Sequence, residues 1–294
     1  MKTQISLIVF FASVLICPAQ SIERDVVASS GDYYEGANIS LSWTLGEIAI
    51  ETYDNGSNIL TQGFQQPGIT LRIYVDLIAF LEGPYNGSDM DITLNSEGLL
   101  PLTQPFNTSP WGYSGTESVG AIPNPEVVDW LLVELRDAVD APSATPATRM
   151  ARKAAFIRSD GSVVGLDGFS ELHFDVNIDN NLFVVLWHRN HLGMMSAFAL
   201  TEAGGVYDYN FTSAMGMAYL NGQKSLNGGV YGMYAGDADA DGEIGPNDID
   251  SYWDLQAGEM GYKSVDFNMN TQVRNQDKND YWHPNKTIIS QVPE

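Results

Sequence analysis

A repeated acidic loop near the C-terminus constrains this chain more than any other feature. The first copy runs from Asp237 to Asp248 and has carboxylates at positions 1, 3, 5 and 12, glycine at position 6 and an aliphatic residue at position 8. A hard cation such as Ca²⁺ binds about six to eight oxygens, so the chain must wrap closely around it, with alternate side chains inward and glycine at the sharp turn. This spacing predicts a calcium loop.

A second copy runs from Asp266 to Asp277. The offset is 29 residues at the first aspartate (266 − 237), at the last aspartate (277 − 248) and at a following tryptophan (282 − 253), which indicates an internal repeat. The second copy has only two carboxylates, and Thr271 stands where glycine would take the left-handed turn, so we expect weaker calcium binding. Each loop is expected to lead into a short helix that its last aspartate caps, with Trp253 and Trp282 packed against the other copy.

Aspartate at position 12 and the lack of a long entering helix distinguish both loops from intracellular sensor hands. With the paired repeat, they make residues 235–294 resemble a type I dockerin, the calcium-folded module by which secreted bacterial proteins dock onto cohesin partners. The resemblance implies two ligand sets, each with a backbone carbonyl at position 7. These are Asp237, Asp239, Asp241, Glu243 and Asp248 in the first loop, and Asp266, Asn268, Asn270, Gln272 and Asp277 in the second.

The N-terminal residues and the net charge of the chain indicate its cellular location and the partners it excludes. Residues 1–19 resemble a secretory signal, with Lys2 before an apolar run and small residues before a cut at Gln20. Lipoprotein processing at Cys17 is the alternative, which the bulky preceding residue disfavours. We therefore expect a secreted or cell-surface protein. The net charge of −23 argues against nucleic acid and anionic membranes as partners, and no later apolar run is long enough for membrane insertion.

The rest of the chain has strand patterns. Residues 20–69 predict a small β-meander, with strict alternation over 39–45 and another short strand at 59–60. Residues 70–233 have many short strands between Gly, Asn and Pro turns and no long helical period, which favours a β-sandwich or jelly-roll. Apolar residues alternate over 71–81, and the continuously apolar run 182–187 predicts a central strand covered on both faces, whereas 148–153 could be a short helix or a strand. Residues 234–294 form the predicted EF-hand-like domain, so the fold is expected to be mostly β with a small α-helical, calcium-binding C-terminal domain.

Two other stretches resemble known segments. Residues 26–67 resemble an N-terminal segment of secreted and surface proteins of certain Gram-negative bacteria. Phe80–Tyr85, Val128–Arg136 and Trp187–Leu192 resemble an uncharacterised β-rich module that accompanies such calcium repeats, in proteins sometimes labelled haemagglutinin or adhesin.

Catalytic motifs are absent from the sequence. His188 and His191 would point to opposite faces of a strand and have no carboxylate at metalloprotease spacing, so we interpret them as a polar strand end. No nucleophile elbow and no phosphate loop are present. The sequence thus favours a non-catalytic protein.

Aromatic loops and a basic cluster suggest other roles. Pro110–Tyr113 and Pro84–Gly87 place aromatic rings in loops where they can stack on sugars, although packing within the protein is commoner. Four basic residues gather within ten positions and predict a solvated face, or one that contacts an acidic domain of the same chain. They are Arg149, Arg152, Lys153 and Arg158.

The leading hypothesis is a secreted calcium-binding protein whose C-terminal domain folds around the metal and docks onto a cohesin-like or surface protein, as in an adhesin. The alternatives are a carbohydrate-binding module that uses the loop aromatics, and a polysaccharide hydrolase anchored by its dockerin-like part.

Overall fold

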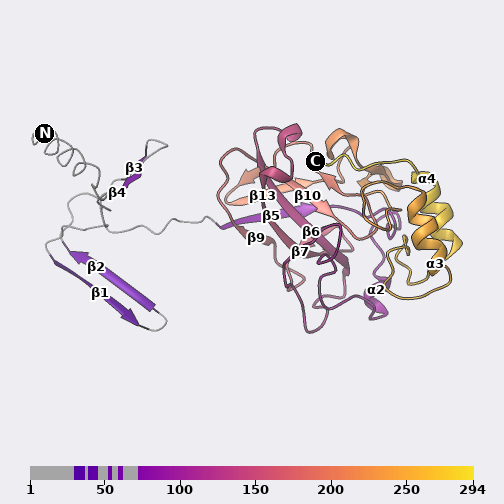
Figure 1. The fold of residues 1–294 in the computed structure, drawn as a ribbon, viewed down its shortest axis with the longest axis horizontal. Coiled ribbons are helices and arrows are strands. Elements are labelled where there is room, and N and C mark those ends of the chain that lie inside the picture. Colours follow the sequence, from indigo (N-terminus) through magenta and orange to yellow (C-terminus); the bar gives the residue numbers. More distant parts are fainter. Residues whose placement is uncertain (1–29, 37–38, 46–51, 55–58, 62–71) are drawn as a thin grey trace, which may run out of the picture. The chain divides into compact units, whose positions relative to one another are not determined.

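The structure, a computed structural model, describes residues 30–36, 39–45, 52–54, 59–61 and 72–294, and the chain divides into compact units at residues 1–69 and 70–294. In the first unit β1 (Ser30–Gly36) pairs with β2 (Ile39–Leu45), and β3 (Thr52–Asp54) pairs with β4 (Ile59–Thr61) (Figure 1). The strands predicted at 39–45 and 59–60 are therefore present. The predicted signal segment lies outside the described residues.

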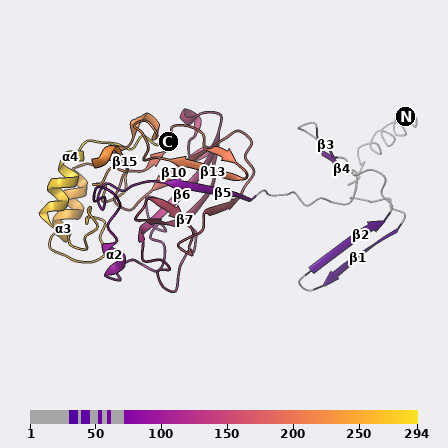
Figure 2. The ribbon, with the colours of Figure 1, turned by 180° about the vertical axis from the view of Figure 1, so that it is seen from behind.

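Nine strands of the second unit form one curled sheet (Figures 1 and 2). Their order is β11-β10-β6-β7-β8-β5-β13-β12, and β9 also pairs with β5. The strands are β5 (Arg72–Ile78), β6 (Val127–Ala138), β7 (Arg149–Arg158), β8 (Ser162–Val164), β9 (Leu172–Asp175), β10 (Asn181–Trp187), β11 (Met194–Met195), β12 (Thr201–Ala203) and β13 (Val206–Asn210). The prediction of a mostly β fold is confirmed.

The short strand β8 explains why the sheet is continuous. Val163 in β8 pairs with Leu77 of β5 and with Ile157 of β7. Hydrogen bonds therefore join the strands on both sides of β8 in one curled sheet, where the sequence had suggested a sandwich or jelly-roll. The strand β13 runs parallel to β5.

Burial follows the sequence pattern of each strand. In β5 alternate residues are buried, as period two requires, whereas every residue of β6 except Asp137 is buried. The run in β10 is also buried and pairs with both β6 and β11, which confirms the predicted central strand. The Trp130 ring of β6 packs 4.2 Å from the Phe156 ring of β7, between centroids. The stretch around 148–153, open between helix and strand, belongs mainly to β7.

The connections of this unit contain only short elements. These are α2 (Thr93–Ser96), η1 (Ala141–Ser143), η2 (Pro146–Thr148), η3 (Tyr219–Asn221), β14 (Lys224–Ser225), η4 (Asn227–Gly229) and β15 (Tyr231–Gly232). Within the described parts of the chain, no helix has the length and apolar character needed to cross a membrane.

Two helical segments follow the acidic loops. The π-helical turn η5 (Asp248–Trp253) continues as α3 (Asp254–Gln256), and η6 (Asp277–Trp282) continues as α4 (His283–Asn285). Figures 1 and 2 show α3 and α4 side by side at one edge of the unit. The two copies share a small apolar core, made of Ala235, Ala238, Ile249, Trp253, Val265, Phe267 and Val273.

The sheet and the second acidic loop touch at Gly83. A Cβ atom on Gly83 would lie 1.7 Å from the backbone oxygen of Phe267, which is far inside van der Waals contact. Only glycine therefore allows this backbone approach.

We expect Gly83→Ala to destabilise the protein by about 1–3 kcal/mol or more, because the added methyl forces two backbones apart. Urea denaturation measures the loss. The matched control is Gly120→Ala, whose Cβ meets no atom within 4 Å. If the two variants unfold at the same urea concentration, the close approach of Gly83 to the backbone of Phe267 is contradicted.

Candidate metal centre

The two acidic loops share one backbone conformation. Positions 4 and 6 are left-handed in both copies: φ is 57° at Ala240 and 90° at Gly242, and 58° at Met269 and 75° at Thr271. Thr271 thus takes the strained conformation that the sequence predicted for position 6.

Each loop pairs with the segment that follows the helix of the other copy. In the first loop Ile244 N donates to Ile288 O at 2.9 Å, and in the second Val273 N donates to Glu259 O at 3.0 Å. The 29-residue offset relates both partners of these bonds (273 − 244 and 288 − 259). The segment that follows each helix, here called the exchanged tail, thus pairs with the loop of the other copy, and a pseudo-twofold relation connects the two copies.

The aspartate at position 12 closes its own loop. Asp248 Oδ1 accepts from Ala238 N at 2.6 Å and Oδ2 accepts from Gly245 N at 2.7 Å. Asp277 Oδ2 accepts from Arg274 N at 2.8 Å in the same way. The predicted capping of the helices by these aspartates is wrong, because their oxygens face back into the loop.

Three carboxylates converge in the first loop. Asp237, Asp239 and Asp248 each offer an oxygen, and these oxygens lie within 4.8 Å of one another. Asp237 Oδ2 accepts from Gly242 N at 3.2 Å, whereas Oδ1 is buried with no hydrogen-bond partner among the described residues. A buried, unsatisfied carboxylate oxygen is costly, and a cation offsets that cost. These three residues can bind a metal ion.

Electrostatic repulsion among the carboxylates of the first loop also indicates a metal-binding site. Burial raises the pKa of Asp237 well above its usual range, and the charges of Asp248, Asp239 and Asp241 raise it further. Burial also raises the pKa of Asp248 to about 7. Because the carboxylates oppose one another's ionisation, the loop favours either protons or a bound cation.

Asp241 and Glu243 lie at the exposed rim of the first loop. Asp241 Oδ1 accepts from Glu243 N at 2.9 Å, so this side chain supports the turn, and Asp241 stands outside the cluster of three. The backbone of Glu243 bridges to Ile289, as that of Gln272 does to Met260 in the second copy.

The second loop satisfies its own oxygens. Asp266 Oδ1 accepts from Asn270 N at 3.1 Å and Oδ2 from Thr271 N at 2.8 Å. The amide oxygen of Asn268 accepts from Asn270 N, and that of Asn270 from Gln272 N. Burial raises the pKa of Asp266 to about 6. The structure thus brings three carboxylates together in the first loop and leaves Asp237 Oδ1 without a donor, whereas backbone donors occupy both oxygens of the corresponding Asp266.

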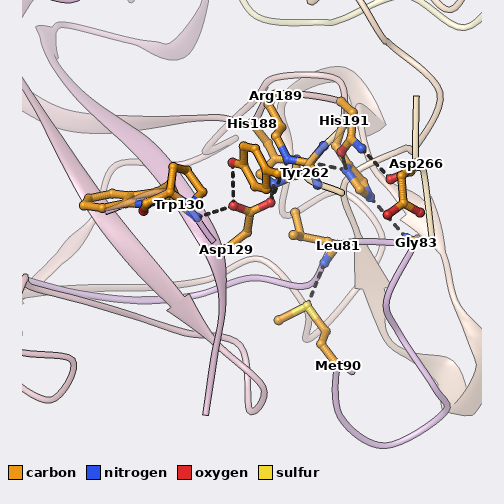
Figure 3. Close-up of polar contacts among 12 residues, drawn as sticks. Leu81, Gly83, Met90, Asp129, Trp130, His188, Arg189, His191, Tyr262 and Asp266 are labelled. Atoms are coloured by element: carbon orange, nitrogen blue, oxygen red, sulfur yellow. Dashed lines mark hydrogen bonds and ion pairs between the residues drawn. The ribbon is translucent and has the colours of Figure 1, made fainter. Parts of the chain in front are cut away.

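Behind the second loop lies a buried network that the sequence analysis missed (Figure 3). Asp129 of β6 accepts from Arg189 Nε at 2.9 Å through Oδ2 and from the Tyr262 hydroxyl at 2.7 Å through Oδ1. The Arg189 guanidinium lies 4.1 Å from the centroid of the Tyr262 ring and donates to Lys263 O. Since Tyr262 and Lys263 lie four and three residues before Asp266, this network, the polar junction, anchors the second loop to the sheet.

The histidine pair belongs to the polar junction. The prediction that the rings point to opposite faces is wrong, because β10 ends at Trp187 and the ring centroids of His188 and His191 lie 4.8 Å apart. Gly83 N donates to His191 Nε2 at 3.1 Å, so His191 carries its proton on Nδ1, 3.0 Å from His188 Nδ1. His188 Nε2 then donates to Asp129 Oδ2 at 3.2 Å. Every ring nitrogen is engaged inside the protein, and none is free for a metal.

The charges of the junction follow from its burial. Burial alone would raise the pKa of Asp129, but Arg189 and then His188 outweigh it and lower the pKa to about 2. Burial lowers the pKa of both histidines, which stay neutral. One sequence signal could have revealed the polar junction: Asp129 lies within the apolar run 127–135, and a buried carboxylate requires a partner.

Comparisons with known proteins give one weak structural similarity and no family match. No protein-family model matches the chain, and no curated protein matches it. One solved chain is similar with a TM-score of 0.32 and 14% identity, over 54% of this chain and 81% of that chain. It comes from a crystal structure of a type II cohesin–X-dockerin complex from Acetivibrio cellulolyticus, an N-terminal interface mutant. A score of this size does not establish a common fold.

We expect Asp129→Asn to lower the free energy of unfolding by about 3–5 kcal/mol, because it leaves the buried Arg189 without a counter-charge. The control is Asp175→Asn, which breaks a pair with Arg72 whose side chains are 54% and 55% exposed. That loss should stay below about 1 kcal/mol. Guanidinium titration followed by tryptophan fluorescence compares them, and similar losses would show that the junction does not hold the fold.

Proposed function

We propose that this chain is an exported, non-catalytic protein whose C-terminal repeat binds calcium and docks it onto a protein partner. The observation that carries the proposal is the first loop, where three carboxylates converge and a buried oxygen of Asp237 lacks a donor. An all-oxygen set in a loop of this spacing suits Ca²⁺ better than the nitrogen- and sulfur-preferring metals. Export is proposed from the signal-like residues 1–19.

Calcium would be held by the side chains of the first loop and by the backbone carbonyl of its position 7. These are Asp237, Asp239, Asp241 and Asp248, with the carbonyl of Glu243. Bound calcium supplies the positive charge that relieves the repulsion among these carboxylates, and so couples metal binding to folding. In the second loop the corresponding residues are Asp266, Asn268, Asn270, Gln272 and Asp277, which we propose as a weaker site.

The second loop serves mainly as the packing partner of the first. Its oxygens are satisfied by its own backbone, and the polar junction fixes it to the sheet. The first loop then closes against the same apolar core and through the exchanged tails.

Exposed apolar side chains on the repeat support a docking role. Leu255 of α3 is 74% exposed, and Met260 and Ile289, which the 29-residue offset relates, are 64% and 53% exposed. A partner that covers such side chains gains the free energy of removing them from water. With the dockerin resemblance, this favours a cohesin-like or surface protein as the partner.

The non-catalytic part of the proposal is supported by the polar junction. It places an aspartate beside a histidine, as many catalytic sites do. Both histidines, however, are buried and use every ring nitrogen within the protein.

We predict that Asp237→Asn will have opposite effects with and without calcium. In chelator the amide removes a buried negative charge and can donate a hydrogen bond from the unsatisfied position, so the thermal midpoint should rise. In calcium the same change removes a ligand, so the stabilisation, about 2.7 kcal/mol at a hundredfold excess over Kd, should largely vanish. Thermal melts followed by circular dichroism measure both.

Two comparisons sharpen this experiment. Asp250→Asn, on the exposed side of η5, should change neither midpoint. Asp266→Asn should lower both, since an amide nitrogen would face the N–H of Asn270 or Thr271. If millimolar calcium leaves the melting of the wild-type chain unchanged, the calcium proposal is wrong.

For docking, we expect the purified chain to bind at least one member of a panel of recombinant cohesin modules in calcium and to lose that binding in chelator. Leu255→Arg should weaken it at least about tenfold, while Val139→Arg, at another 66% exposed apolar residue, should not. Biolayer interferometry measures the affinities. Binding that is equal in chelator, or no binding at all, would contradict the cohesin-like partner and leave the calcium measurement standing.

A further inference from the structure

A cavity of about 710 Å³ lies between the curled sheet and the first acidic loop. One wall comes from the ends of β6 and β7 and carries Arg149 and Arg152. The opposite wall comes from the first loop and carries Asp241 and Glu243, and Trp111 contributes an aromatic surface. The Trp111 ring also packs against the sheet core, whereas the four charged side chains are not part of that core.

A β-bulge brings the two arginines together. Leu135 pairs with Ala151 and Arg136 pairs with Arg149, so Met150 is an extra residue on β7. Because the extra residue shifts the alternation by one, Arg149 and Arg152 line the same cavity although three positions separate them.

The four clustered basic residues therefore do not form one solvated face. Lys153 lies 5.1 Å from the centroid of the Phe174 ring, and Arg158 pairs with Asp160 at 3.5 Å. Only Arg149 and Arg152 face the acidic repeat, across the cavity.

Trp111 is held in a fixed position. Its ring meets Phe106 edge to face, with centroids 5.1 Å apart, and its backbone oxygen accepts from Arg152 at 2.7 Å. The other predicted sugar-stacking rings are used within the protein: Tyr113 is buried with its hydroxyl on Glu117, and Tyr85 packs on Phe80. Of the rings predicted to stack on sugars, Trp111 thus remains as the one that lines the cavity, where Trp187 of β10 is a second aromatic residue.

The charges of the two walls restrict the occupant. The arginine wall repels cations and the carboxylate wall repels anions, whereas guanidinium groups donate hydrogen bonds and carboxylates accept them. Glu134, also in the wall, pairs with Arg136 at 2.7 Å and with Arg149 at 3.6 Å, so part of the donor capacity of Arg149 is already used within the wall. The occupant should be uncharged, able to donate and accept hydrogen bonds along its edges, and apolar on one face. A pyranose ring has this combination.

We propose that the cavity binds a neutral oligosaccharide. One sugar ring stacks on Trp111, and its hydroxyl groups lie between the two arginines and the carboxylates of Asp241 and Glu243. The site shares Asp241 with the proposed calcium loop, and Ile289 lies in its wall. It needs neither a protein partner nor the exposed side chain of Leu255, so its test can fail while the docking test succeeds.

Isothermal titration calorimetry on the full chain tests the proposal. The probes are cellotetraose, xylotetraose and mannotetraose as neutral oligosaccharides, with tetragalacturonate as the anionic one, each at about 5 mM, where millimolar affinity registers. We expect at least one neutral probe to bind. Trp111→Ala should weaken it at least about tenfold, and Arg149→Ala should also weaken it.

The matched control is Phe169→Ala, at a ring that is 65% exposed outside the cavity, which should leave the affinity unchanged. Circular dichroism verifies that each variant is folded. The proposal is overturned if no neutral probe binds, if Trp111→Ala binds as tightly as the wild type, or if tetragalacturonate binds more tightly than every neutral probe.

Discussion

The ion pair between Asp129 and Arg189 determines how the parts of the 70–294 unit fit together. Both groups are buried, so neither can lose its partner without a large penalty. Arg189 also contacts Tyr262 and Lys263, and in this way the sheet fixes the start of the second acidic loop. The second loop in turn supports the first, and the first forms a wall of the cavity. A buried charge pair thus links the sheet to the acidic repeat, and through the repeat to the cavity wall.

Sequence reasoning succeeded where the signal is local. The alternation in β5, the continuous burial in β10 and the left-handed turn at Thr271 were all predicted, because each depends on neighbouring residues. The polar junction was missed because Asp129 and His188 are 59 positions apart and meet only through the pairing of β6 with β10. The continuity of the sheet was missed because β8 has only three residues, too few for a periodic pattern.

The two copies of the repeat carry different amounts of backbone strain. Gly242 and Gly258 are left-handed in the first copy, with φ of 90° and 89°, whereas the second has Thr271 and Thr287 at the same positions, with φ of 75° and 73°. A left-handed residue other than glycine costs about 1–2 kcal/mol. The strained copy is the one that the polar junction holds to the sheet. This agrees with the general rule that strain persists where surrounding contacts fix the conformation.

The exchanged tails impose an order in which the two loops can fold during synthesis of the chain. Ile244 finds its backbone partner in Ile288, which the ribosome adds 44 residues later (288 − 244). The second loop needs only the segment at 258–261, which precedes it in the chain. The second loop can therefore form while synthesis continues, and the first must wait until Ile288 has been added. Closure of the first loop thus marks a completed C-terminal repeat.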